Sequence, residues 1–231
     1  MRITAASALS ALALWGTFLA AAPALAGDGA LDQAILRIQE QWAHVNYEVT
    51  GADKLKGFTA LEQETEALAK QYPDRPEPLI WQAISLSTHA GAKGGLGALS
   101  MAKSARELLL AAEKIDPNAM HGSIYTTLGS LYHKVPGWPI GFGDDAQAEK
   151  YLKKALTLNP NGIDANYFYG ELLFDQHQYA EASKVLRHAL EARPRPDRPI
   201  ADRGRTEEVR NLLARVEAEL GGAETVRSAA R

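Results

Sequence analysis

Apolar residues recur at intervals of three and four along most of the chain, and this spacing predicts a protein made almost entirely of α-helices. The first apolar face consists of Leu31, Ile35, Ile38, Trp42 and Val45. The last lies within residues 202–220 and has the same spacing. We expect antiparallel helix pairs over residues 31–73, 76–117, 122–160 and 163–194, closed by a capping helix over residues 202–220.

Two of these helix pairs share one pattern of small residues and proline. The later pair carries it at Gly170, Ala182, Ala189 and Pro194, with spacings of 12, 7 and 5 residues. The earlier pair carries it at Gly129, Ala148, Ala155 and Pro160, with spacings of 19, 7 and 5. Small side chains let two helices approach closely, and proline ends the second helix because it lacks an amide donor. The pattern resembles the tetratricopeptide repeat (TPR), which implies an all-α, right-handed solenoid of about four helix pairs.

Residues 1–26 have the pattern of a secretory signal peptide. Arg2 supplies the positive start, residues 5–22 form an apolar run, and Ala24-Leu25-Ala26 is a small-x-small cleavage site. We expect cleavage after Ala26 and export to the periplasm. The alternative is a membrane anchor, which an alanine-rich run followed by Pro23 suits poorly. The repeat domain then covers residues 27–221, and residues 222–231 are expected to be a disordered tail.

Composition excludes several kinds of chemistry. The chain has no cysteine, so it has no disulfide, thiol nucleophile, thiolate metal site or lipid-bearing N-terminal cysteine. Its formal net charge of −3 makes nucleic acid an unsuitable partner. The six histidines show no metal-ligand spacing, and no nucleophile elbow is present. We therefore expect no enzyme activity, no cofactor and no metal. The arginines of residues 193–205 alternate with aspartates, which favours a solvated salt-bridge face.

Two longer segments give a narrower resemblance. Gly94-Gly95-Leu96 leads into a Met-x-Lys-Ser-x-Arg-Glu-Leu-Leu helix, and residues 128–139 read Leu-Gly-x-Leu-Tyr-x-Lys-Val-Pro-Gly-Trp-Pro. Together with Gly143-Asp144, they resemble the T-component (TatT-like) proteins associated with tripartite ATP-independent periplasmic (TRAP) transporters. That resemblance implies a periplasmic protein that forms oligomers and meets a ligand or a solute-binding protein in a central cleft. The missing cysteine departs from the lipoproteins of that family.

The concave wall of such a solenoid consists of the first helix of each pair, and its exposed side chains are the candidate binding residues. Aromatic groups beside charges are frequent in binding sites. These candidates are Thr126, Ser130, His133, Lys134, Tyr167, Glu171 and Phe174. A second candidate contact lies in the long turn with Trp138 and Phe142, which either project as an apolar patch or fold back as packing residues.

The sequence thus favours a non-catalytic, exported binding protein that uses the concave face of a TPR solenoid. One hypothesis is a T-component-like accessory, which predicts oligomers and a closed cleft for a small amphipathic ligand. The alternative is a general cell-envelope scaffold for protein or peptide partners, which predicts a monomer with an open groove.

Overall fold

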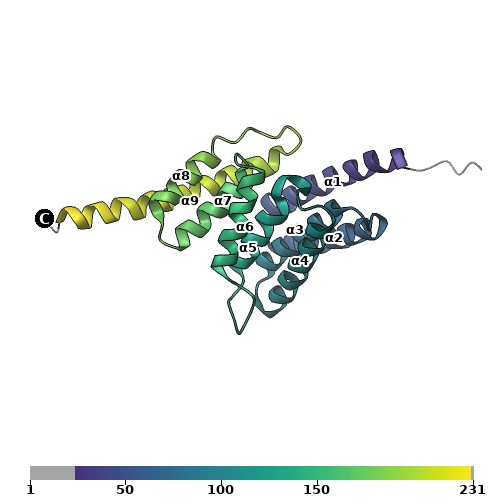
Figure 1. Ribbon diagram of the computed structural model, residues 1–231, viewed down its shortest axis with the longest axis horizontal. Helices are drawn as coiled ribbons and strands as arrows, with labels where there is room; N and C mark the ends of the chain where they lie inside the picture. The colour runs from purple at the N-terminus through teal and green to yellow at the C-terminus, as the bar shows by residue number, and fades with distance from the viewer. Residues whose placement is uncertain (1–23, 230–231) are drawn as a thin grey trace, which may run out of the picture.

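The computed structural model describes residues 24–229, and this part of the chain forms nine α-helices, one short 3-10 helix and no strand (Figure 1). The predicted signal segment therefore lies outside the described residues, except for its last three residues, which begin the first helix. The helices are α1 (Ala24–Tyr47), α2 (Gly51–Gln71), α3 (Pro76–Lys93), α4 (Gly95–Ile115), α5 (Ser123–Lys134), α6 (Asp145–Leu158), α7 (Ile163–Asp175), α8 (Tyr179–Ala189) and α9 (Pro199–Ala229). A 3-10 helix, Ala119–Gly122, precedes α5.

Neighbouring helices pack in pairs, and this confirms the predicted all-α solenoid. The close approaches occur at the small residues. Gly129 of α5 faces Leu152 of α6, and Gly170 of α7 faces Leu186 of α8. Four alanines on the second helices are completely buried, at positions 148, 155, 182 and 189. A side chain at either glycine would occupy the space that the facing leucine fills.

The glycine-rich segment around Gly94-Gly95-Leu96 does not form a long turn between α3 and α4. α3 continues to Lys93, and only Gly94 separates it from α4. Gly94 and Gly95 have φ values of 66° and 70°, in the left-handed region that glycine adopts at little cost. The long turn that contains Trp138 and Phe142 is a loop between α5 and α6, as predicted. Asp144 caps α6 there, since its Oδ1 accepts a hydrogen bond of 3.0 Å from the Gln147 amide.

The last helix differs from its predicted form at both ends. It continues to Ala229, although residues 222–231 were expected to be a disordered tail and Gly221 the end of the helix. Nothing within 4 Å would meet a Cβ at Gly221 or Gly222, so the two glycines only lower the helix propensity of an exposed segment. Residues 230–231 lie outside the described part.

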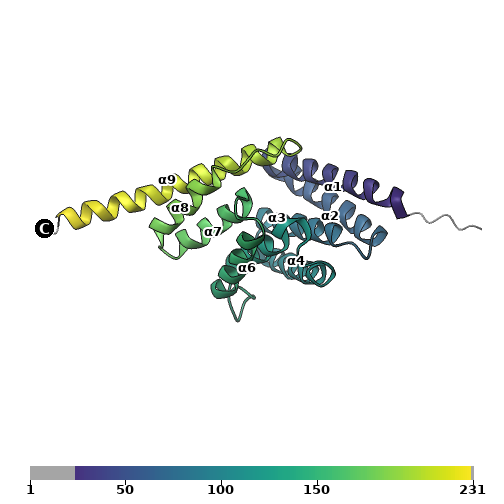
Figure 2. The same ribbon diagram turned by 45° about the horizontal axis from the view of Figure 1, so that its top comes forward.

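The start of α9 joins the two ends of the array. Val209, Leu212 and Val216 pack against α7 and α8, as a capping helix should. Ala201, however, belongs to the apolar cluster of α1 and α2, so the first turns of α9 contact α1 (Figure 2). Gly204 permits this contact, because a Cβ there would lie 2.3 Å from Cδ1 of Tyr47. The concave side is therefore bridged from the first helix to the last.

Candidate ligand-binding cavity

A cavity of about 1650 Å³ lies on the concave side of the solenoid. Its wall comes from α1, α3, α4, α5 and α7, the segment between α8 and α9, and the first turns of α9. The lining mixes indole and aliphatic groups with hydroxyl, carboxylate and guanidinium groups. Drug-sized ligands usually occupy about 300–1,000 Å³, so this space exceeds the need of one such molecule.

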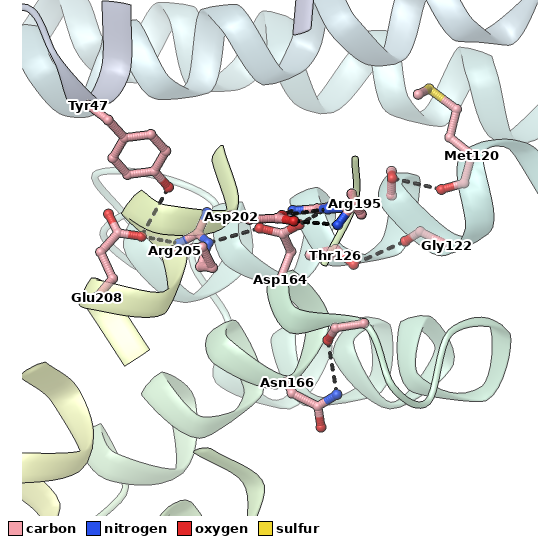
Figure 3. A network of polar contacts seen from close by, with 12 residues as sticks. Tyr47, Met120, Gly122, Thr126, Asp164, Asn166, Arg195, Asp202, Arg205 and Glu208 are labelled. Carbon is pink, nitrogen blue, oxygen red and sulfur yellow. Dashed lines mark hydrogen bonds and ion pairs between the residues drawn. The ribbon is translucent and has the colours of Figure 1, made fainter. Parts of the chain in front are cut away.

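Five of the seven predicted concave residues line this cavity. Thr126, Ser130 and Lys134 come from α5, and Tyr167 and Glu171 come from the adjacent α7. Nζ of Lys134 lies 2.8 Å from Oε1 of Glu171, an ion pair that joins the two helices across the wall. The Thr126 hydroxyl donates a hydrogen bond of 3.2 Å to the Gly122 carbonyl (Figure 3).

The other two predicted residues, His133 and Phe174, do not line the cavity. The two ring nitrogens of His133 lie 2.9 Å from Asp145 and 2.9 Å from Asp175, so the imidazole links α5, α6 and α7. Phe174 packs within the apolar cluster of α7, α8 and α9, with the Arg215 guanidinium carbon 4.5 Å from its ring centroid. Phe174 is covered because α9 runs along the face of α7 that the sequence predicted to be open.

The two aromatic residues of the long turn have different environments. Trp138 is 89% exposed. The Phe142 ring centroid, in contrast, lies 5.3 Å from the Tyr132 ring centroid and 4.3 Å from the Arg106 guanidinium carbon. Phe142 is therefore a packing residue, and Trp138 is a candidate contact outside the cavity. Among the lining residues, the turn contributes Val135, Pro136 and Ile140.

A polar network closes the cavity where α7 meets α9. Figure 3 shows Asp164 between Arg205 and Arg195, with Tyr47 of α1 directed toward Glu208. Oδ1 of Asp164 accepts a 2.8 Å hydrogen bond from Nε of Arg205, and its Oδ2 accepts a 3.0 Å bond from Arg195. Arg205 also binds Glu208 at 2.6 Å, and the Tyr47 hydroxyl donates to Glu208 at 3.2 Å.

This network corrects the expectation of a solvated arginine face. Arg205 is only 7% exposed, and its guanidinium carbon lies 4.5 Å from the Tyr167 ring centroid and 4.7 Å from that of Phe168. Arg195 also binds Asp202, with Nε to Oδ1 at 2.7 Å. The alternation of Arg and Asp in sequence resembles an exposed charged helix. These charged side chains become buried contacts only because residues 192–205 fold over α7.

Burial opposes ionisation of Asp164, but the guanidinium groups of Arg205, Arg195 and Arg198 outweigh it and hold the Asp164 pKa well below its usual range. A carboxyl whose pKa is lower in the folded protein stabilises the fold above its unfolded pKa of about 4. That contribution is lost as the pH falls from there toward the folded pKa.

We therefore expect Asp164→Asn to destabilise the protein at about pH 7 and to cost progressively less as the pH falls below about 4, where the wild-type carboxyl begins to lose its advantage. Urea unfolding of both proteins across this range measures the difference. The exposed pair of Lys56 and Asp53, at 3.0 Å, provides a control, and Asp53→Asn should change stability little at any pH. A pH-independent loss in Asp164→Asn would contradict the electrostatic origin.

Several cavity residues were missing from the sequence-based candidates. Trp42 and Trp81 line the wall from the first helices α1 and α3, and Met120 and His121 line it from the 3-10 helix. Met120 and His121 have positive φ values of 50° and 51°, which no repeat pattern predicts. The sequence pattern predicts Trp42 and Trp81 only as core residues, since their helical spacing is that of the buried face.

The described residues contain no group of three or more His, Cys, Asp or Glu side chains arranged to hold a metal ion. In the same part of the chain, no helix has the length and apolar character needed to cross a membrane.

Comparison with known proteins supports the repeat assignment. The tetratricopeptide repeat family matches residues 140–216. Among solved structures, the crystal structure of a thermophilic TPR protein in Thermus thermophilus is similar, with 20% identity and a TM-score of 0.52. The match covers 85% of this chain and 95% of that one. The curated proteins gave no match. Residues 140–216 thus carry the tetratricopeptide repeat, and the chain around them has the fold of a TPR protein.

Proposed function

We propose that this protein is a non-catalytic binding protein that holds an extended segment of a protein partner in its concave cavity. The single observation that carries the proposal is one continuous cavity of about 1650 Å³, lined from α1 to α9. Its size exceeds that of ordinary small-ligand sites and suits a peptide segment, and TPR solenoids present such concave surfaces for binding.

The mixed character of the wall also suits a peptide. Lys134 and Glu171 offer charges on one side, and hydroxyl groups at Thr126 and Ser130 can exchange hydrogen bonds with a peptide backbone. Leu131 and Val135 give apolar surface beside them. Neither the repeat match nor the similar structure indicates an enzyme family.

A photo-crosslinking experiment tests this proposal. We expect p-benzoylphenylalanine at Ser130, which lines the cavity, to form a crosslink to one contiguous segment of one partner in the native host. The same group at Lys103, which is exposed on α4 outside the lining, should not. Ser130→Trp should abolish copurification of that partner by filling the space. Equal crosslinks from both positions, or an unaffected partner in Ser130→Trp, would refute binding in the cavity.

A second candidate function is favoured by the contact between α1 and α9. This contact bridges the concave side, which an open docking groove would not require. A T-component-like accessory that encloses a small amphipathic ligand is the corresponding proposal, and it includes periplasmic location and oligomer formation. Native mass spectrometry of gently purified protein distinguishes it, because a bound small molecule in an oligomer supports this function and a bare monomer opposes it.

A further inference from the structure

The side chain of Arg198, in the cavity wall, forms no ion pair with the described residues. Arg198 lies between α8 and α9, is half-buried and lines the cavity. Its neighbours Arg195 and Arg205 each pair with two carboxylates, but no described acidic side chain lies within ion-pair distance of Arg198. The Nε atom of Arg198 is buried and has no hydrogen-bond partner among the described residues.

The electrostatic surroundings make this charge costly. Burial and the neighbouring Arg195 lower the pKa of Arg198, and the carboxylates of Asp164, Asp202 and Asp197 offset this only in part. An arginine nevertheless keeps its proton at neutral pH. The molecule therefore holds a partly desolvated positive charge that has no direct ion pair among the described residues, and an anion bound in the cavity would supply one.

Apolar surface adjoins Arg198 directly. Its guanidinium carbon lies 5.5 Å from the Trp81 ring centroid, and the Trp42 ring lies 6.1 Å from the Trp81 ring. Ile84 and Met120 pack against the same cluster and line the cavity. Trp81 is only 2% exposed, and its indole Nε1 has no hydrogen-bond partner in the described chain. A ligand at this end therefore meets a cation beside an aromatic and aliphatic wall.

The balance of charge in the wall points the same way. The protein has a formal net charge of −3. The cavity lining nevertheless contains six lysines and arginines against four aspartates and glutamates. Two of the lining cations besides Arg198, at positions 54 and 193, also have no acidic partner within ion-pair distance among the described residues. The formal charge of the lining residues is thus positive, opposite to the net charge of the protein, and it favours the binding of anions.

We infer that this end of the cavity binds a small organic acid with an apolar body. Its carboxylate pairs with Arg198, and its body lies against the apolar wall that includes Ile84 and Met120, next to Trp81. The inference rests on the proposed function only in placing the ligand in the same cavity. It adds a ligand class, and a protein partner remains a separate question that the Ser130 crosslink answers independently.

Calorimetric titration of the full chain with octanoate, octan-1-ol and octylammonium tests the inference. We expect octanoate to bind and the neutral and cationic analogues to bind far more weakly. Arg198→Gln should weaken octanoate binding about tenfold to a hundredfold, as expected for loss of a charge-assisted hydrogen bond. Arg210→Gln, at an exposed arginine of α9 outside the lining, should leave it unchanged.

Arg198→Lys keeps the charge and should retain most of the affinity, and thermal unfolding of each variant without ligand shows that it is folded. Absence of octanoate binding, equal binding of octan-1-ol, or unchanged affinity in Arg198→Gln would overturn the inference. Displacement of octanoate by an acidic peptide of higher affinity would overturn the assignment to a small acid. None of these outcomes alters the Ser130 crosslink, so the two proposals fail separately.

Discussion

Arg205→Met is expected to lower the free energy of unfolding by about 3 kcal/mol, the low end of the cost of breaking a buried ion pair. The substitution keeps most of the aliphatic stem but removes the charge that lies between Asp164 and Glu208. Asp164 and Glu208 are each about a third exposed, at 34% and 38% of the side chain, so water partly screens what is lost. Urea denaturation measures the change.

A neighbouring arginine provides the control for Arg205→Met. Arg203 pairs with Glu48, the residue directly after α1, at 3.1 Å, but its side chain is 69% exposed. Arg203→Met should therefore change stability by less than about 1 kcal/mol. Equal effects of the two substitutions would show that the Asp164 network does not hold α9 in place. The rate of amide hydrogen exchange in the first turns of α9 should also rise in Arg205→Met but not in Arg203→Met. The reason is that α9 contacts α1 through these turns.

Gly129→Leu is expected to destabilise the protein by about 3 kcal/mol or more through overpacking between α5 and α6. A Cβ at Gly129 would lie 2.5 Å from Cγ of Leu152 and 3.1 Å from the Ala148 carbonyl oxygen. The leucine can change rotamer, but the carbonyl belongs to the backbone of α6 and moves only if the helix moves. The helix pair must therefore separate to accept the larger side chain.

Gly221→Leu is the matched control for this substitution. Gly221 also lies within a helix, but no heavy atom within 4 Å would meet a Cβ there. Replacement of a glycine in a helix should slightly stabilise the protein through helix propensity. The melting temperature should therefore fall in Gly129→Leu and rise slightly in Gly221→Leu. A Gly129→Leu protein that melts like the wild type would refute the close approach of α5 and α6.

The contact of α9 with α1 decides which functions the cavity can serve. A solenoid that ended with α8 would leave Tyr167 and Phe174 on an open wall. In the structure, Arg205 covers the Tyr167 ring and Arg215 covers the Phe174 ring. Tyr167 and Glu171 of α7 still line the cavity, with Glu171 facing Lys134, whereas Phe174 does not. This arrangement concentrates binding in one bridged cavity.

The sequence by itself determined the helix pairs and their packing. The small residues at Gly129 and Gly170, the alanines opposite them and the prolines after α6 and α8 act through local sterics and backbone chemistry. These interactions depend on spacing within one repeat, so a single sequence displays them. The same logic placed Thr126, Ser130, Lys134, Tyr167 and Glu171 on the concave wall, where they line the cavity.

Only the tertiary structure decided which end of that wall remains accessible. The path of α9 depends on contacts between residues far apart in sequence, such as Tyr47 with Glu208 and Asp164 with Arg205. The spacing of residues along the chain does not indicate which two residues form such a pair. Local sequence therefore could not show that Phe174 is covered or that Arg205 is buried. It also could not show that Arg198 lies beside Trp81 and forms no ion pair with the described residues, because the distribution of charge in a cavity is set by how the whole chain closes around it.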